Sequence, residues 1–281
     1  MENTHVVYGA YVTSKQGEFD ETQFETVKAL LSNKDVIGFD SEGVNLGRYG
    51  ELSLLQFSVK DEHNNVHVVL IDAYEMHVQY HELVESVLAS PHVLKIVHDC
   101  RQDSDALFHH TAIKLTNVFD TMIGHQKLHP GARAGLNEAL SRQDLPEVPR
   151  DGVDYRLNPE FWRTGRRADH TLTEGMIQYA SGDVLRLHEL YEAQRGNLDV
   201  TLLSQLQTDT EFALRMREAE VDDIKPNNMG RFIGRAGVTV RALERDTRTY
   251  IYANRNASNR VHVYYHADIS DLARVRAAAR N

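Results

Sequence analysis

Apolar residues along this chain follow two spacings, which predict strands and helices in turn. Alternating or continuous apolar runs bounded by turn residues predict strands. These are Val6–Thr13, Val36–Asp40, Leu52–Val59, Val66–Ile71, Val93–Val97 and Asn117–Phe119. Apolar residues recurring three and four positions apart predict helices. These are Glu21–Ser32, Val78–Ala89, Asp103–His110, Thr121–Leu128, Leu136–Arg142, Thr173–Gln194 and Leu202–Val221.

The order of these elements predicts an α/β fold. Predicted strands follow one another closely after residue 35, which favours antiparallel neighbours at the start of a mixed sheet. Helices then alternate with strands and are expected to cover the faces of the sheet.

Residues 143–170 interrupt the periodic pattern with prolines and glycines. Long irregular stretches in compact domains are usually functional or disordered. This one carries Arg150, Arg156, Arg163, Arg166 and Arg167. These arginines favour contact with a substrate, and Arg163 is a candidate nucleic-acid contact; the alternative is a solvated surface loop.

Charge divides the chain unequally. The 281 residues carry a formal charge of −10. Residues 1–220 hold 20 basic and 35 acidic residues, whereas residues 221–281 hold 11 and 6. We therefore predict a large domain at 1–220 and a small basic one at 221–281, joined near Asp222–Asn228. A basic segment of this size suits a polyanionic partner.

Several protein classes do not fit this composition. No apolar run approaches the roughly 20 residues of a membrane helix. Cys100 is the single cysteine, so a disulfide framework is excluded and a reducing compartment fits better. The first residues lack the basic and apolar regions of a secretion signal. We expect an intracellular protein, in either nucleus or cytoplasm.

Acidic residues gather at three places. Asp40 and Glu42 end a strand-like run two residues apart, so they share a face. Tyr179 and Asp183 lie four apart on a helical pattern, which is also one face. A further cluster spans 99–105. Carboxylates brought together repel one another unless cations neutralise them, so the pattern predicts two Mg²⁺ or Mn²⁺ ions.

In this order and spacing, the motifs resemble the DEDD superfamily of 3′-5′ exonucleases, of the RNase D and nuclear-exosome type. Asp40-Ser-Glu42 matches the first motif, His98 followed by Asp103 the second, and Tyr179 followed by Asp183 the third. The tyrosine assigns the DEDDy branch.

The resemblance covers roughly Val36 to Tyr191. The run from Asp40 to Gly47, with Leu55-Gln-Phe and His98-Asp-Cys-Arg, further resembles the Egalitarian-like subgroup. The resemblance to the exonucleases implies an RNase H-like mixed sheet flanked by helices.

The resemblance also implies a mechanism. Asp40, Glu42, Asp103 and Asp183 would hold two divalent ions, one activating a water and the other steadying the leaving oxygen. Tyr179 would orient the attacking water. Glu42 would also contact the terminal 3′-hydroxyl. Leu55, Gln56 and Phe57, on the neighbouring strand, are candidates to pack against the last base.

Other polar residues near these motifs have alternative interpretations. Asp105 could replace Asp103 as ligand, but the spacing from His98 favours Asp103. Asp120 is expected to be a helix N-cap, and His98 a hydrogen-bonded core residue.

A zinc site is a weaker hypothesis. His77 and His81 have zinc-like spacing, but the sequence offers no third ligand. Trp162 and Phe161 are expected to pack beneath the arginine-rich stretch.

The basic segment resembles a KH domain core. Gly234-Arg235-Ala236-Gly237 forms a GxxG loop between predicted helices, followed by strands at Tyr250–Tyr252 and Val261–Tyr265 and a helix at Asp271–Ala279. Glycines let a backbone approach phosphates, and such domains clamp about four nucleotides. The alternative is an αβ dimerisation module, and a KH-mediated dimer is compatible with the sequence.

The two resemblances together imply a 3′-5′ exoribonuclease that releases nucleoside 5′-monophosphates from single-stranded RNA held by the KH domain. An inactive RNA-binding adaptor on the same fold is the competing class. A DNA substrate is the third hypothesis.

Overall fold

The computed structural model describes residues 11–13, 19–74, 76–149, 160–165, 171–219, 226–253, 261–266 and 270–280. The chain divides into two compact units. The first holds the described residues up to Leu214, and the second those from Arg215 onward. The second unit therefore begins earlier than the predicted boundary at residue 221. Among the described residues, each helix is too short or too polar to span a bilayer.

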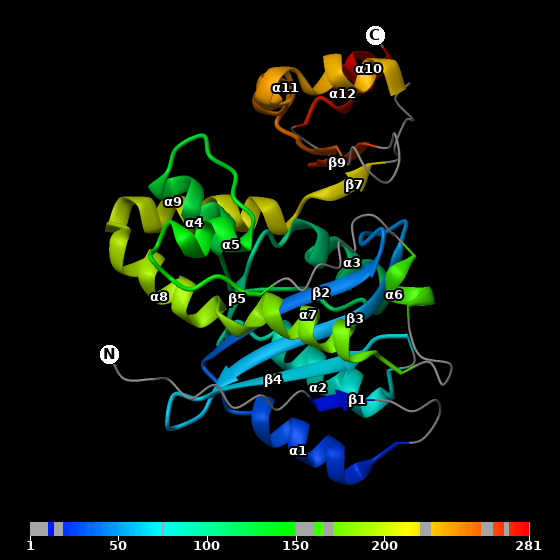
Figure 1. The fold of residues 1–281 in the computed structure, drawn as a ribbon, viewed down its shortest axis with the longest axis vertical. Coiled ribbons are helices and arrows are strands. Elements are labelled where there is room, and N and C mark those ends of the chain that lie inside the picture. Colours follow the sequence, from blue (N-terminus) through cyan, green and yellow to red (C-terminus); the bar gives the residue numbers. More distant parts are fainter. Residues whose placement is uncertain are drawn as a thin grey trace. The chain divides into compact units, whose positions relative to one another are not determined.

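A mixed sheet forms the centre of the first unit (Figure 1). Its strands are β1 (Tyr11–Thr13), β2 (Val36–Val44), β3 (Glu51–Lys60), β4 (Val66–Asp72), β5 (Leu94–Val97) and β6 (Val118–Asp120). They lie in the order β1-β4-β3-β2-β5-β6. The pairs β2–β3 and β3–β4 are antiparallel, and the other pairs are parallel. This confirms the predicted mixed sheet with antiparallel neighbours at its start.

Helices cover both faces of this sheet. They are α1 (Glu21–Leu31), α2 (Val78–Leu88), α3 (Arg101–Thr111), α4 (Thr121–Leu128), α5 (Leu136–Ser141), α6 (Phe161–Thr164), α7 (Glu174–Leu185), α8 (Leu187–Asn197) and α9 (Val200–Leu214). Residues of α1, α2, α3 and α9 share one hydrophobic core with the sheet. Residues of α5, α6, α7 and α8 share the other. In Figure 1, α7 crosses the face formed by β2 and β3.

The strand β3 shows how burial fixes the register. Its residues from Leu52 to Val59 are all buried. Leu55 and Phe57 belong to the core on the α3 side, whereas Leu54 belongs to the core on the α7 side. Each such side chain contributes roughly 1.5–3 kcal/mol when buried, and a slip of one residue would exchange the two faces. The same register therefore also fixes the positions of the polar residues that lie between them.

The second unit holds a three-stranded antiparallel sheet and three α-helices in its described part. Its elements are β7 (Arg217–Ala219), α10 (Pro226–Ile233), the 3₁₀ turn η2 (Arg235–Gly237), α11 (Val238–Thr247), β8 (Tyr250–Ala253), β9 (Val261–Tyr265) and α12 (Leu272–Arg280). The strand order is β7-β9-β8. Met229, Phe232, Val240, Ile251 and Val263 lie in its own core.

Two predicted helices differ from the structure. The predicted helix at Thr173–Gln194 is two helices, α7 and α8, separated at Arg186. The predicted helix at Leu202–Val221 ends at Leu214, because β7 pairs with β9 instead. The predicted strand at Val6–Thr13 is described only from Tyr11 to Thr13.

Candidate metal centre and nucleic-acid contacts

The strand β2 places Asp40 and Glu42 on one face of the sheet, because side chains two residues apart in a strand share a face. Asp40 pairs with Gln56 of β3. The register shifts directly after Glu42. A Cβ atom at Gly43 would lie 1.8 Å from the carbonyl oxygen of Glu51, so only glycine allows the two strands to approach here. The run Asp-Ser-Glu-Gly thus presents two carboxylates beside a close backbone contact.

The helix α7 brings Tyr179 and Asp183 onto this face. Ser58, on the same face of β3, donates its hydroxyl to the carbonyl oxygen of Val184 at 2.8 Å. Gly38 makes this close packing possible, since a Cβ atom there would fall 2.2 Å from the Ser58 hydroxyl oxygen. Residues four apart on a helix share a face, so Tyr179 and Asp183 lie on the same side of α7.

Asp40, Glu42 and Asp183 meet at one point. Each offers a carboxylate oxygen, and these oxygens lie within 4.8 Å of one another. Burial raises the pKa of Asp40 well above its ordinary value, and the charges of Asp103, Asp183 and Glu42 raise it further. A divalent cation would offset this repulsion. The donor set consists of carboxylate oxygens, which Mg²⁺ and Mn²⁺ prefer, so these residues fit such an ion.

Asp103 lies outside that group of three. It is buried on α3, and its Oδ1 accepts hydrogen bonds from the backbone N–H of Ser41 at 2.9 Å and from the Ser41 hydroxyl at 2.6 Å. Burial raises the pKa of Asp103 to about 7, although the Ser41 hydroxyl bond lowers it. Sequence reasoning missed Ser41. The strand alternation that places Asp40 and Glu42 together also turns Ser41 to the opposite face, towards α3.

Asp105 has a different partner from Asp103. Its carboxylate accepts from the Arg48 backbone N–H and from the Arg48 Nε, both at 3.1 Å. His110, on the same helix, contacts the carbonyl oxygen of Gly47 at 3.0 Å through Nε2. Asp105 therefore fixes the loop between β2 and β3.

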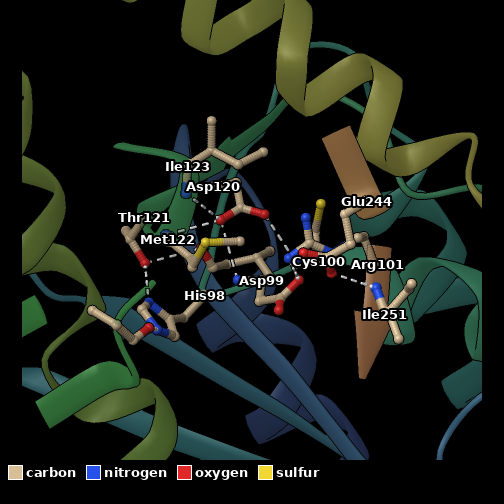
Figure 2. A network of polar contacts seen from close by, with 12 residues as sticks. His98, Asp99, Cys100, Arg101, Asp120, Thr121, Met122, Ile123, Glu244 and Ile251 are labelled. Atoms are coloured by element: carbon tan, nitrogen blue, oxygen red, sulfur yellow. Dashed lines mark hydrogen bonds and ion pairs between the residues drawn. The ribbon is translucent and has the colours of Figure 1, made fainter. Parts of the chain in front are cut away.

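Asp120 and His98 belong to a network of polar contacts (Figure 2). The Asp120 carboxylate accepts from the backbone N–H groups of Met122 at 2.9 Å and Ile123 at 3.1 Å, which confirms the predicted N-cap of α4. It also accepts from the N–H groups of Asp99 at 3.1 Å and Cys100 at 2.9 Å. These bonds tie the start of α3 to the start of α4.

His98 is held at both ring nitrogens. Its Nδ1 lies 2.8 Å from the Thr121 hydroxyl oxygen, and its Nε2 lies 3.0 Å from the carbonyl oxygen of Ala134. This confirms the predicted hydrogen-bonded role. Together with the Asp120 bonds, it fixes the chain just before Asp103.

Tyr179 is partly buried against the core on the α7 side. Its ring centroid lies 6.1 Å from that of Trp162 on α6. Trp162 is buried in the same core and contacts Phe161 edge-on, with centroids 5.5 Å apart. The expected packing of Trp162 beneath the arginine-rich stretch lies outside the described residues, because residues 150–159 and 166–170 of that stretch are not described.

The residues expected to contact nucleic acid in the first unit differ in exposure. Gln56 is fully buried. Leu55 and Phe57 are buried in the opposite core, so the expectation that they pack against a base is wrong. The side chain of Arg163 is half exposed and forms ion pairs with Glu51, at 2.6 Å, and with Glu160. Arg150, Arg156, Arg166 and Arg167 lie outside the described residues.

The segment Gly234–Gly237 lies between α10 and α11 in the second unit. Gly234 has φ of 74° and Gly237 has φ of 75°, a region that favours glycine. A Cβ atom at Gly234 would lie 2.1 Å from the Thr239 hydroxyl oxygen. Arg235 is exposed, and Ala236 lies beside it in the 3₁₀ turn. The Arg235 side chain is therefore accessible to a ligand.

The zinc hypothesis gains no support among the described residues. His77 is the N-cap of α2 and accepts from the Gln79 N–H at 3.4 Å. His81 contacts the carbonyl oxygen of Thr111 at 2.9 Å through Nε2. The part of the chain that the structure describes offers only Asp40, Glu42 and Asp183 as a group of three suitable ligands.

Comparison with known proteins finds a matching family model and several relatives. A family model described as 3′-5′ exonuclease matches residues 17–199. Ribonuclease D of Haemophilus influenzae is 30% identical over 197 residues, covering 69% of this chain and 45% of that protein. The piRNA biogenesis protein EXD1 of Homo sapiens is 34% identical over 94 residues, covering 33% of this chain and 17% of that protein. The chain thus spans less than half the length of these relatives.

Solved structures share the fold of about three quarters of this chain. Trypanosoma brucei RNase D superposes with a TM-score of 0.58 at 19% identity, covering 74% of this chain and 72% of that one. Brucella melitensis NrnC with bound Mg²⁺ superposes with a TM-score of 0.52 at 21% identity, covering 74% and 90%. At these identities the likeness concerns the fold alone.

Proposed function

Because this chain belongs to the 3′-5′ exonuclease family, we propose that it is a two-metal exoribonuclease that trims single-stranded RNA from the 3′ end. Its products would be nucleoside 5′-monophosphates. The observation that carries the proposal is the meeting of Asp40, Glu42 and Asp183 within 4.8 Å. RNA is favoured as substrate because Ribonuclease D is among the relatives, and Trypanosoma brucei RNase D, which shares the fold, was solved in complex with RNA U12.

Each residue of the site would have a distinct part in this reaction. Asp40, Glu42 and Asp183, with Asp103 beside them, would hold the divalent cations. Bound cations of this kind lower the pKa of a water and stabilise charge on the leaving oxygen. The Tyr179 hydroxyl would orient the attacking water while Trp162 supports its ring. Glu42 would contact the terminal 3′-hydroxyl.

The second unit would act as a KH domain that holds the RNA strand. Its support is the Gly234–Gly237 loop between two helices, followed by two strands and a closing helix. Both glycines have positive φ, which allows the backbone to approach phosphates. The following helix α11 would direct its N-terminal N–H groups to the same anion. The run Asp40–Gly47 with His98-Asp-Cys-Arg favours the Egalitarian-like subgroup of the family.

The test is incubation of the purified protein with 5′-labelled single-stranded RNA and DNA in Mg²⁺, Mn²⁺ or EDTA. We expect stepwise shortening of RNA with either cation and none in EDTA. Asp40→Ala and Asp183→Ala should abolish shortening, because each removes a ligand of the cations. Glu25→Ala, an exposed carboxylate on α1, serves as the matched control and should retain full activity.

Two results would contradict the proposal. If RNA stays intact with both cations, the adaptor hypothesis replaces it. If DNA is shortened and RNA is not, the reaction class stands but the substrate is wrong.

A further inference from the structure

Gln56 in the middle of β3 buries an amide group that has no hydrogen-bond partner. The side chain is 0% exposed. Neither its Nε2 nor its Oε1 has a partner among the described residues. Burying an amide without a partner is unfavourable, and such groups in native proteins are uncommon enough to require a reason.

The surroundings of Gln56 point to Asp40. Gln56 pairs directly with Asp40 of β2 and, on its other side, with Leu70 of β4. Directly opposed residues in antiparallel strands share a face and have Cβ atoms about 4.5–5.5 Å apart. Leu70 has no polar side-chain atom. The Asp40 carboxylate is therefore the polar group that the strand pairing places beside the amide.

Ser58 shows that a polar residue on this face can be satisfied structurally. It lies two residues further along β3, on the same face as Gln56. Its hydroxyl donates to the Val184 carbonyl oxygen of α7 at 2.8 Å. Gln56 has no such bond to α7 among the described residues. The amide is thus not used to hold the helix on the sheet.

We propose that Gln56 is a positioning residue for Asp40: when the carboxylates hold a divalent cation, the Gln56 NH₂ group donates to the Asp40 carboxylate and fixes its orientation. An ionised carboxylate only accepts hydrogen bonds, and the amide supplies a donor at the same strand position. Carboxylates that bind metals are generally oriented by such bonds, and their loss costs 10–100-fold in metal affinity or activity. This inference rests on the proposed cation site, and it replaces direct contact of the fully buried Gln56 with nucleic acid.

The decisive variant is Gln56→Met in the full chain, which keeps the volume and removes the amide. Mn²⁺ binding is measured calorimetrically without RNA, and thermal unfolding is measured without cation. We expect the Kd for Mn²⁺ to rise about 10–100-fold, while the cation-free Tm stays the same or rises because an unpaired buried amide is gone. Gln56→Leu is the second variant, measured should Gln56→Met not fold.

Thr210→Val is the matched control, since it removes another buried polar group that has no hydrogen-bond partner among the described residues, on α9 and outside the cation site. It should leave the Kd unchanged, and the Tm should stay the same or rise. An unchanged Kd in Gln56→Met would overturn the inference, whatever the Tm. It would also be overturned if the wild-type protein does not bind Mn²⁺, or if Asp183→Ala binds Mn²⁺ as tightly as wild type. Wild-type protein that binds Mn²⁺ but leaves RNA intact would contradict the proposed function alone.

Discussion

The ring of Tyr179 lies against Trp162, and Tyr179 shares a face of α7 with Asp183 because the two are four residues apart. Tyr179→Phe keeps the ring and removes the hydroxyl. We expect kcat to fall on the order of 100-fold with KM nearly unchanged, because the hydroxyl acts mainly in the transition state. Single-turnover release of labelled nucleotide measures this. An unchanged Tm confirms that the packing is intact, and an unchanged kcat would reduce Tyr179 to a packing residue.

Asp103 and Asp105 are two residues apart but have different partners. Asp103→Asn keeps an oxygen that accepts from Ser41, so the fold should survive. It removes the charge that acts on Asp40, and we expect nucleotide release to be lost. Asp105→Asn weakens only the ion pair with Arg48 and should reduce release less than tenfold.

The same release assay with Mn²⁺ compares the two variants, and circular dichroism checks that both fold. Full activity in Asp103→Asn, together with loss of activity in Asp105→Asn, would mean that Asp105 and not Asp103 is the metal ligand. It would also change the register of the second motif relative to His98.

At the scale of elements, His188 joins α8 to the sheet. It is buried, and its Nε2 lies 3.1 Å from the Ser58 carbonyl oxygen. Burial lowers the pKa of His188 below its usual 6.5, although the hydrogen bond to the Ser58 carbonyl raises it. The charge of Lys60 also lowers this pKa, and the charges of Glu192 and Glu189 raise it. The unfolded chain then binds a proton more readily than the folded one, so stability is retained above pH 6.5 and lost as the pH falls below it.

His188→Gln provides the test, because an amide can donate to the Ser58 carbonyl oxygen without titrating. Between pH 7 and pH 5, we expect wild type to lose more stability than the variant, because only wild type has a group that binds a proton more readily in the unfolded chain. Urea unfolding at both pH values measures the difference. Equal losses in the two proteins would show that His188 titrates alike in the folded and unfolded chain.

Local periodicity predicted the elements better than it predicted where they end. The pattern at 173–194 is helical throughout, but the helix is interrupted at Arg186. Leu187 there packs against the sheet beside Gly38. The strand β7 was predicted as helix because its pairing partner, β9, lies far along the sequence. Tertiary contacts of this kind override local preference.

The candidate site shows the same division. Strand and helix periods predicted that Asp40 would lie beside Glu42 and that Tyr179 would lie beside Asp183. The pairing of Gln56 with Asp40 depends on the register of β2 and β3, which a core on each face determines. The Asp105–Arg48 ion pair joins a helix to a distant loop, and the sequence carries no local signal for it.

At the scale of the whole molecule, the two parts of the chain carry opposite charge. Residues 1–220 hold 20 basic and 35 acidic residues, and residues 221–281 hold 11 and 6. An acidic surface repels RNA unless cations neutralise its site, whereas a basic one attracts RNA over a distance set by salt. We therefore expect the affinity for RNA to arise mainly from the second unit and the chemistry from the first.

Replacing Arg235-Ala236 by Asp-Asp tests this division, because it puts two negative charges where phosphates are expected. Affinity for single-stranded RNA should fall at least several-fold, and its dependence on salt should flatten because fewer counterions are released. Fluorescence anisotropy across a salt series measures both. Ala273→Asp with Ala277→Asp adds two charges at exposed positions of α12 and is the matched control; it should leave the salt slope nearly unchanged. If folded Asp-Asp protein binds RNA as tightly as wild type, the Gly234–Gly237 loop is not a nucleic-acid clamp, and the dimerisation alternative then gains support.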